Sequence, residues 1–189
     1  MGYAEREYPL FSACGLNCGL CPRYHTEGTS KCPGCGGEGF LDKHPSCGVL
    51  SCCQRKQIDC CYECGELPCK KVDNADQSDS FITHKNQLTD LAKVKKIGIE
   101  AYKAELNEKV KMLQKLLDYY DDGRRKSFFC VVINLLPLCD IEMSMFEIGK
   151  QCDSVPLVKE RATIAVRFLQ ARADKRGIDL KLRKKGKGG

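Results

Sequence analysis

The chain of 189 residues has no tryptophan and no long hydrophobic run. Its longest mainly apolar stretch, Phe128 to Leu138, is about half the ~20 residues that a membrane-spanning helix requires. The first residues, Met1 to Glu7, lack the apolar core of a signal peptide. We therefore expect a cytoplasmic protein with a modest hydrophobic core and no membrane association.

Recognisable catalytic motifs are also missing. The sequence contains no Ser-His-Asp order, no glycine-rich phosphate-binding loop and no H-E-x-x-H helix. These absences argue against the enzyme classes that such motifs define. Whether the protein is an enzyme stays open at this point, and we favour a non-enzymatic role.

Cysteine, in contrast, is abundant. Of fifteen cysteines, twelve lie between residues 14 and 69. In a reducing compartment such a cluster indicates metal ligands rather than disulfides. The odd count and the adjacent pairs Cys52-Cys53 and Cys60-Cys61 also disfavour a disulfide framework, because neighbouring cysteines bridge each other only with strain. The other three are predicted to be small core residues: Cys130, Cys139 and Cys152.

The spacing of the clustered cysteines is typical of zinc knuckles. A C-x2-C spacing lets a tight turn direct two thiolates at one metal ion. Three pairs have it: Cys18/Cys21, Cys32/Cys35 and Cys61/Cys64. A third cluster supplies further candidate ligands: Cys47, Cys52, Cys53, Cys60, Cys61, Cys64 and Cys69. With four ligands per site, twelve cysteines could fill about three sites and ten could fill about two.

The first cluster allows a different metal. Cys14, Cys18 and Cys21 lie within eight residues and are followed by Pro22. This arrangement suits an iron–sulfur cluster as well as it suits zinc, so a [4Fe-4S] cluster is the alternative cofactor. No alternating strand–helix pattern follows, which argues against a radical S-adenosylmethionine barrel. Two histidines within the cluster, His25 and His44, could replace a thiolate as ligands.

Several motifs occur together in residues 10–72: Cys14-Gly15-Leu16-x-Cys18-x2-Cys21-Pro22-x-Tyr24, the Cys32-x2-Cys35 knuckle, and Cys47-x4-Cys52 through Cys61-x2-Cys64-x3-Pro68-Cys69-Lys70. Together they resemble a widespread prokaryotic family of unknown function, whose small cysteine-rich members are often described as metal or zinc binders. The family implies no activity. Cys53 and Cys60 depart from its pattern, which leaves a third site in question. The resemblance implies ten ligands: Cys14, Cys18, Cys21, Cys32, Cys35, Cys47, Cys52, Cys61, Cys64 and Cys69.

The rest of the chain has helical periodicity. Beyond a polar, acidic linker near residues 72–80, apolar residues recur at spacings of three and four. They predict helices over residues 86–96, 99–120, 128–136, 140–149 and 156–177. Apolar and charged residues then alternate from Ile178 to Leu182, which predicts a short strand.

The expected fold is a small, irregular, metal-stabilised cysteine-rich module at residues 10–72 followed by a mostly α-helical domain at residues 81–183. Residues 184–189 are expected to form a flexible basic tail. The net charge of +6 arises after Ala171, where eight basic residues accompany two acidic ones.

The function expected from these features is metal binding, with about two or three zinc ions and an unknown biological role. A protein partner would suit such a structural or interaction module. The alternative is an iron–sulfur protein with a redox or electron-transfer role. A third interpretation is nucleic-acid binding through zinc knuckles and the basic tail. The scarcity of basic and aromatic residues between residues 14 and 69 disfavours it.

Overall fold

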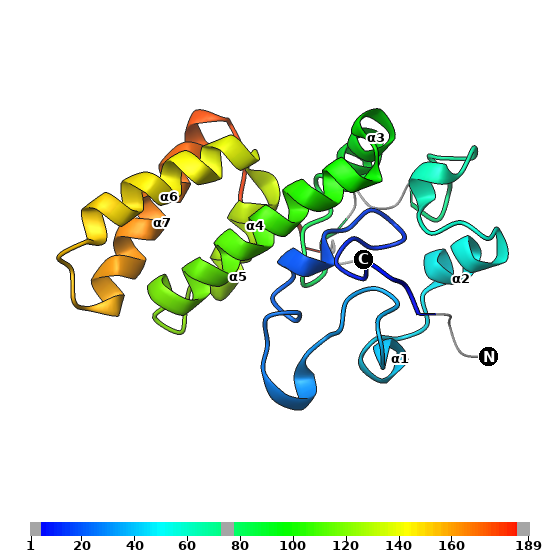
Figure 1. The fold of residues 1–189 in the computed structure, drawn as a ribbon, viewed down its shortest axis with the longest axis horizontal. Coiled ribbons are helices and arrows are strands. Elements are labelled where there is room, and N and C mark those ends of the chain that lie inside the picture. The colour runs from blue at the N-terminus through cyan, green and yellow to red at the C-terminus, as the bar shows by residue number, and fades with distance from the viewer. Residues whose placement is uncertain (1–4, 73–77, 185–189) are drawn as a thin grey trace, which may run out of the picture. The chain divides into compact units, whose positions relative to one another are not determined.

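The computed structural model describes residues 5–72 and 78–184. Its contacts divide the chain into two compact units. The first includes the chain up to Leu106 and again from Leu182, and the second is Asn107–Lys181. Within the described residues the regular structure is entirely helical, as Figure 1 shows. The predicted domains at residues 10–72 and 81–183 stay a prediction.

The cysteine-rich part of the first unit is irregular, as the sequence predicts. Loops predominate, and the α-helices α1 (Phe40–Lys43) and α2 (Gly48–Arg55) are short. Single 3-10 turns lie at Cys18–Leu20, Gly28–Ser30 and Cys61–Glu63. Longer helices begin only with α3 (Gln87–Ile97) and α4 (Ile99–Tyr120), which match the predicted helices closely. Gly98 separates them with a φ of 84°, a conformation that other residues rarely adopt.

The turn that carries the first cysteines packs directly on α3. Gly15 has a φ of 92°, and a Cβ atom there would lie 2.5 Å from Cγ of Leu91. Phe11 and Leu20 are fully buried beside this turn, and the ring of Phe11 packs on Tyr102 at a centroid distance of 4.8 Å. Each such side chain contributes roughly 1.5–3 kcal/mol when buried. The irregular segment therefore takes part in a hydrophobic core with α3 and α4.

A buried polar network fixes the same turn. The amide nitrogen of Asn17 donates to Asp90 on α3 at 2.8 Å, and its amide oxygen accepts from the Tyr102 hydroxyl on α4 at 2.8 Å. Asn86 also donates to the Asp90 carboxylate. Because Asn17 is only 3% exposed, each of its polar atoms needs a partner within the protein. The sequence between Cys14 and Cys18 is thereby held against both helices.

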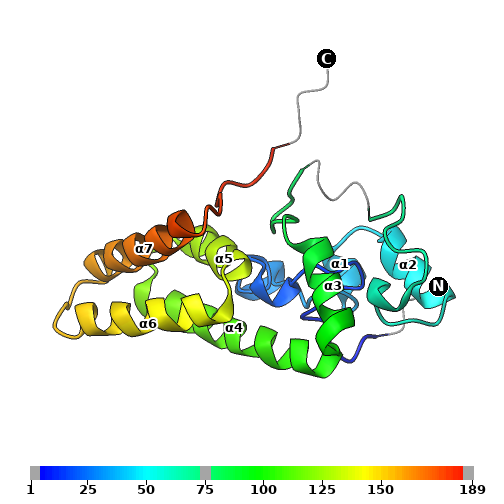
Figure 2. The ribbon, with the colours of Figure 1, turned by 90° about the horizontal axis from the view of Figure 1, so that it is seen from above.

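The second unit is a group of helices with an apolar core. It contains the end of α4 with α5 (Lys126–Leu135), α6 (Leu138–Cys152) and α7 (Val158–Lys175). Helix α7 packs against α5 and α6, and Figures 1 and 2 both show α6 and α7 side by side. The apolar run that begins at Phe128 is thus a helix, as predicted. Its core contains these buried side chains: Leu113, Leu116, Phe129, Ile133, Leu136, Ile141, Ile148 and Leu169.

A buried carboxylate ties two helices of this unit together. Asp140, which is 4% exposed, lies in the first turn of α6. It pairs with Arg176 at 2.7 Å and lies 3.9 Å from Arg172. Helix α6 begins two residues earlier than the prediction, directly after Pro137. Asp140 therefore lies inside the helix and holds the end of α7.

Two predictions are wrong. The strand predicted from Ile178 to Leu182 does not form, because no neighbouring strand pairs with this segment in the described part of the chain. Cys139 is exposed, whereas Cys130 and Cys152 are buried as predicted. Cys139 is the second residue of α6 and lies on its outer side. Of the predicted tail, residues 185–189 lie outside the described residues. No helix among the described residues is both long and apolar enough to cross a membrane.

The network around Asn17 predicts that Tyr102→Phe destabilises the protein. The substitution removes the hydroxyl that donates to the buried amide oxygen of Asn17, and loss of this hydrogen bond costs about 1–3 kcal/mol. Chemical denaturation of the full chain measures the loss. Tyr119→Phe is the matched control, because Tyr119 is 59% exposed, and it should change stability by less than about 0.5 kcal/mol. Equal stability of the two variants would contradict this role for the network.

A second prediction concerns Asp79, whose carboxylate accepts from Arg183 and from the backbone N–H of His84, each at 2.8 Å. Burial alone would raise the pKa of Asp79, but these hydrogen bonds outweigh it and lower the pKa below its ordinary value. The stabilisation is therefore complete above the ordinary pKa of about 4 and is lost as the pH falls through the lowered folded value.

Asp79→Asn should lower the free energy of unfolding by about 1.5–3 kcal/mol at pH 7. The difference from the wild-type chain should be the same at pH 5 and smaller at pH 3. Denaturation at the three pH values measures it, with the exposed Asp118→Asn as control. A difference that grows on acidification would contradict the assignment.

Candidate metal centre

Two of the C-x2-C pairs form the expected tight turns. In the turn Cys18–Leu20 the N–H of Cys21 donates to the carbonyl of Cys18 at 3.1 Å. In the turn Cys61–Glu63 the N–H of Cys64 donates to the carbonyl of Cys61 at 3.0 Å. Each pair of cysteines therefore begins and ends a single 3-10 turn. Such turns hold two thiols at neighbouring positions, as a metal knuckle requires.

The remaining pair, Cys32 and Cys35, is shaped by its packing on Pro9. Gly34 between them has a φ of 90°, and a Cβ atom there would lie 2.5 Å from the carbonyl oxygen of Pro9. The N–H of Cys35 donates to that same carbonyl at 3.0 Å. A glycine is therefore required at this position both by the backbone angle and by the close approach.

Six thiols of the first two motifs and the start of the third act on one another electrostatically. We call Cys14, Cys18, Cys21, Cys32, Cys35 and Cys47 the first thiol group. Burial raises the pKa of Cys18 well above its ordinary value, and the charges of Cys35, Cys14 and Cys21 raise it further. Burial likewise raises the pKa of Cys14 and Cys21, with further increases from Cys47 and Cys32 respectively. The charge of Cys14 also raises the pKa of Cys60 and Cys61, so these electrostatic interactions extend beyond the first group.

Five further cysteines line one cavity of about 30 Å³. We call Cys52, Cys53, Cys61, Cys64 and Cys69 the second thiol group. Apolar walls are provided by Val49, Ile58, Leu67 and Val72, and the charged lining residues are Lys56, Glu66 and Lys71. A cavity of this size can hold a small ion or about one water molecule. Five cysteines from residues 52 to 69 thus border a single cavity.

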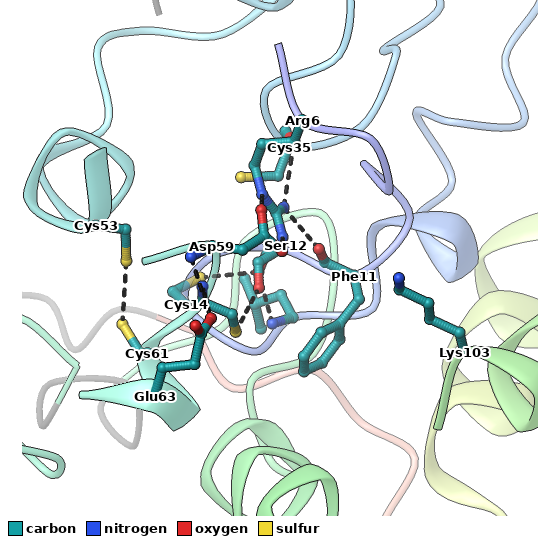
Figure 3. A network of polar contacts seen from close by, with 12 residues as sticks. Arg6, Phe11, Ser12, Cys14, Cys35, Cys53, Asp59, Cys61, Glu63 and Lys103 are labelled. Atoms are coloured by element: carbon teal, nitrogen blue, oxygen red, sulfur yellow. Dashed lines mark hydrogen bonds and ion pairs between the residues drawn. The ribbon is translucent and has the colours of Figure 1, made fainter. Parts of the chain in front are cut away.

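Two thiols of the second group are in direct contact. Sγ of Cys53 on α2 is 3.8 Å from Sγ of Cys61, and Figure 3 shows the two sulfurs facing each other. The contact with Cys61 lowers the pKa of Cys53. The same contact, together with burial, raises the pKa of Cys61. The contact therefore favours the deprotonated form of Cys53 and the protonated form of Cys61.

Positive charges lie near both groups. The Lys56 ammonium donates to Sγ of Cys64 at 3.4 Å and pairs with Glu66 at 2.7 Å. Beside the first group, burial raises the pKa of Cys35 to about 11, and the nearby guanidinium of Arg6 opposes this increase. Arg6 therefore favours the deprotonated form of the Cys35 thiol.

Arg6 also links the segments of chain that carry the two groups. Its guanidinium makes a bidentate pair with Asp59 at 2.8 and 2.7 Å and donates to the carbonyls of Phe11 and Cys35 at 2.7 and 3.3 Å (Figure 3). The Arg6 side chain is only 6% exposed. Sequence reasoning missed Arg6, Asp59 and Lys56, because none belongs to a spacing motif and their partners are distant in the chain.

Successive carbonyls of residues 11–14 organise the first unit. Phe11 accepts from Arg6 at 2.7 Å, and Ser12 accepts from the Cys60 thiol at 3.4 Å. Ala13 accepts from the N–H of Cys61 at 2.9 Å. Cys14 accepts from the side-chain amide of Gln87 on α3 at 2.7 Å. Three separate parts of the unit, at Arg6, at Cys60-Cys61 and at α3, are therefore attached to one short stretch of backbone.

Cys60 lies apart from the cavity of the second group. It is fully buried, and its thiol donates to the carbonyl of Ser12. Burial raises the pKa of Cys60 to about 12. The structure thus separates the two cysteines that depart from the family pattern, since Cys53 lines the cavity and Cys60 contacts backbone.

Both candidate histidines contact nearby backbone. Nε2 of His25 lies 2.8 Å from the carbonyl oxygen of Gly19, and Nδ1 of His44 lies 2.8 Å from the carbonyl oxygen of Pro45. The ring of His44 also stacks on Phe40 at a centroid distance of 4.8 Å.

The thiol groups do not form closed coordination shells. No disulfide joins the fifteen cysteines, all of which lie among the described residues. Across residues 5–72 and 78–184, no three Cys, His, Asp or Glu side chains are gathered tightly enough to enclose a metal ion. The donor chemistry fits a thiophilic metal, and binding would require the sulfurs of a group to move closer together.

Comparison with known proteins supports the resemblance seen in the motifs. Residues 10–74 match the model of a family described as "Protein of unknown function (DUF3795)". No curated protein and no solved structure matches the chain. The match covers every cysteine of the two thiol groups and ends before α3.

The Arg6–Asp59 pair predicts that Asp59→Ala destabilises the protein. The substitution leaves a buried guanidinium without its bidentate acceptor, and we expect a loss of about 1–3 kcal/mol in the free energy of unfolding. Chemical denaturation measures the loss. The control is Glu108→Ala, which breaks an exposed pair with Lys111 and should cost less than about 1 kcal/mol. Equal losses in the two variants would contradict a stabilising role for the Arg6–Asp59 pair.

Proposed function

We propose that this protein binds zinc through its two thiol groups and that the metal stabilises the cysteine-rich segment. The role is structural rather than catalytic, and the segment serves as a docking or interaction module. The proposal assigns about one zinc ion to each group, held by four thiolates. It assumes a reducing compartment such as the cytoplasm, where clustered thiols persist without disulfides.

The observation that carries the proposal is that five cysteines line one cavity. Thiolate is the preferred donor for structural zinc, and four thiolates complete its tetrahedral shell. Four of the five cysteines are also ligands implied by the family motifs: Cys52, Cys61, Cys64 and Cys69. The lining offers just one carboxylate, Glu66, which is paired with Lys56. A hard cation such as calcium or magnesium would require more oxygen ligands.

The first thiol group supports a second site by the same chemistry. It contains the turn from Cys18 to Cys21 and the glycine-shaped pair Cys32 and Cys35, each of which presents two thiols. Four of its six sulfurs would complete a tetrahedral shell.

The electrostatics explain why a metal would be favourable here. Burial raises the pKa of Cys14, Cys18 and Cys21, so these thiols keep their protons in the absence of a metal. A divalent ion displaces those protons and compensates the thiolate charge. Arg6 and Lys56 offset part of the remaining negative charge.

An iron–sulfur cluster in the first thiol group is the second candidate. The charges of Cys14, Cys21 and Cys35 all act on Cys18, so the C-x3-C-x2-C-Pro motif has a fourth thiol nearby. Three closely spaced cysteines and one distant cysteine are a common ligand set for [4Fe-4S]. The cavity of the second group, at about 30 Å³, suits a single ion better than a cluster of eight atoms.

Metal analysis of the purified chain tests the proposal. We expect about two zinc ions per chain and a colourless solution from anaerobic purification without added metal. Cys18→Ser and Cys61→Ser should each lose about one zinc ion, since each removes a thiolate from a different group. Cys139→Ser is the matched control, because Cys139 is an exposed thiol in the second unit, and it should retain the wild-type content.

The outcomes separate the candidates. Iron with acid-labile sulfide and absorbance near ~400 nm would replace zinc with the iron–sulfur candidate. A folded chain with no bound metal would contradict metal binding altogether. Hydrogen exchange adds a second readout: a chelator should remove amide protection from residues 10–72 while the helices of residues 107–181 keep theirs.

A further inference from the structure

Cys53 and Cys61 are held close together by the fold around them. Cys53 lies near the end of α2, and its carbonyl accepts from the N–H of Ile58 at 3.1 Å. Cys61 begins a 3-10 turn, and its N–H donates to the carbonyl of Ala13 at 2.9 Å. Their sulfurs lie 3.8 Å apart and are directed at each other (Figure 3). The backbone thus presents these two thiols as a preformed pair.

The pair has an environment that a small neutral oxidant can reach. Both side chains are almost fully buried, at 2% and 7% exposed, yet both line the cavity of the second thiol group. The walls of that cavity are mostly apolar. A space of about 30 Å³ admits a molecule near the size of water.

We propose that Cys53 and Cys61 are a redox modification site that forms a reversible disulfide when a peroxide reaches the cavity. Formation of the bond requires the two sulfurs to approach from 3.8 Å to about 2.05 Å.

The chemistry balances with hydrogen peroxide as the oxidant. One thiolate attacks a peroxide oxygen, so an S–O bond forms, the O–O bond breaks, and the leaving hydroxide takes a proton to become water. The second thiol then attacks the sulfenic sulfur, and a second water leaves as the S–S bond forms. Two thiols and one hydrogen peroxide thus yield one disulfide and two waters. A dithiol reductant reverses the step by thiol–disulfide exchange.

The disulfide would also control the metal, a consequence that rests on the proposed function. Cys61 belongs to the set Cys52, Cys61, Cys64 and Cys69, whereas Cys53 is the surplus thiol in the same cavity. Joining Cys53 to Cys61 removes one of four thiolates from the zinc. Zinc has no redox chemistry, so it leaves unchanged as the divalent ion. Oxidation of the pair would therefore release zinc from the second group.

Peptide mapping tests the pair directly. The full chain is treated with hydrogen peroxide, alkylated and digested with trypsin without reduction, in both metal-free and metal-loaded forms. Cleavage after Lys43, Arg55, Lys56 and Lys70 places Cys53 in residues 44–55 and Cys61 in residues 57–70. We expect these two peptides to become linked and to separate again with dithiothreitol.

Neighbouring cysteines provide matched controls. Cys53→Ser and Cys61→Ser should each reduce the linked species to background. Cys52→Ser and Cys60→Ser remove an adjacent thiol from the same peptides and should retain it. A link that persists in Cys53→Ser, or its absence from the treated wild-type chain, would overturn the inference.

Zinc release gives a separate readout. With a colorimetric zinc indicator, the metal-loaded wild-type chain should release about half its zinc at a peroxide dose that leaves Cys53→Ser loaded. Equal release from both would contradict control by this pair. A linked peptide in a chain that never holds metal would uphold the modification site and contradict the proposed function. Bound zinc without a linked peptide would support the proposed function and contradict the modification site.

Discussion

The first unit depends on the backbone of residues 11–14, whose four carbonyls accept hydrogen bonds from Arg6, Cys60, Cys61 and Gln87. A buried carbonyl without a partner is costly, so each of these bonds restricts where its donor can lie. The carbonyls of Ala13 and Cys14 locate the second thiol group and α3 relative to the turn that carries the first cysteines. Gly15 then allows this turn to approach α3 more closely than any side chain would permit. Hydrogen bonds to this short stretch thus supplement the small amount of regular secondary structure in residues 10–72.

This arrangement buries many thiols at the cost of keeping them protonated. Burial raises the pKa of most thiols in the first group, and neighbouring sulfurs raise it further. Buried thiols that keep their protons contribute little to the stability of the fold unless a metal ion takes the place of the protons. A divalent metal would replace them and cross-link segments that are distant in sequence, which is the role proposed for zinc. The second unit does not require a metal for stability, because its helices bury a continuous set of apolar side chains.

The helices could be predicted because the sequence features that define them lie within each helix or at its ends. Apolar spacing and Gly98 place α3 and α4 to within a residue or two at each end. The prediction of a strand after Gly177 was wrong. Alternating apolar and charged residues are typical of a half-buried strand, but a strand also requires a neighbouring strand to pair with, which the sequence pattern does not specify. The C-x2-C spacing predicted the turns at Cys18 and Cys61 for the same local reason. The composition of the two thiol groups could not be predicted. It depends on contacts such as that between Cys53 on α2 and Cys61, and on Arg6, whose partner Asp59 lies far along the chain.

Zinc K-edge X-ray absorption of the purified chain tests the central claim most directly, because it reports the atoms bound to the metal. The account predicts a shell of four sulfur atoms at about 2.3 Å, with no nitrogen or oxygen contribution. Such a shell would show that thiolates alone hold the metal and would exclude His25 and His44 as ligands. A shell of nitrogen and oxygen atoms at about 2.0–2.1 Å would contradict the account, because the metal would then lie outside the two thiol groups.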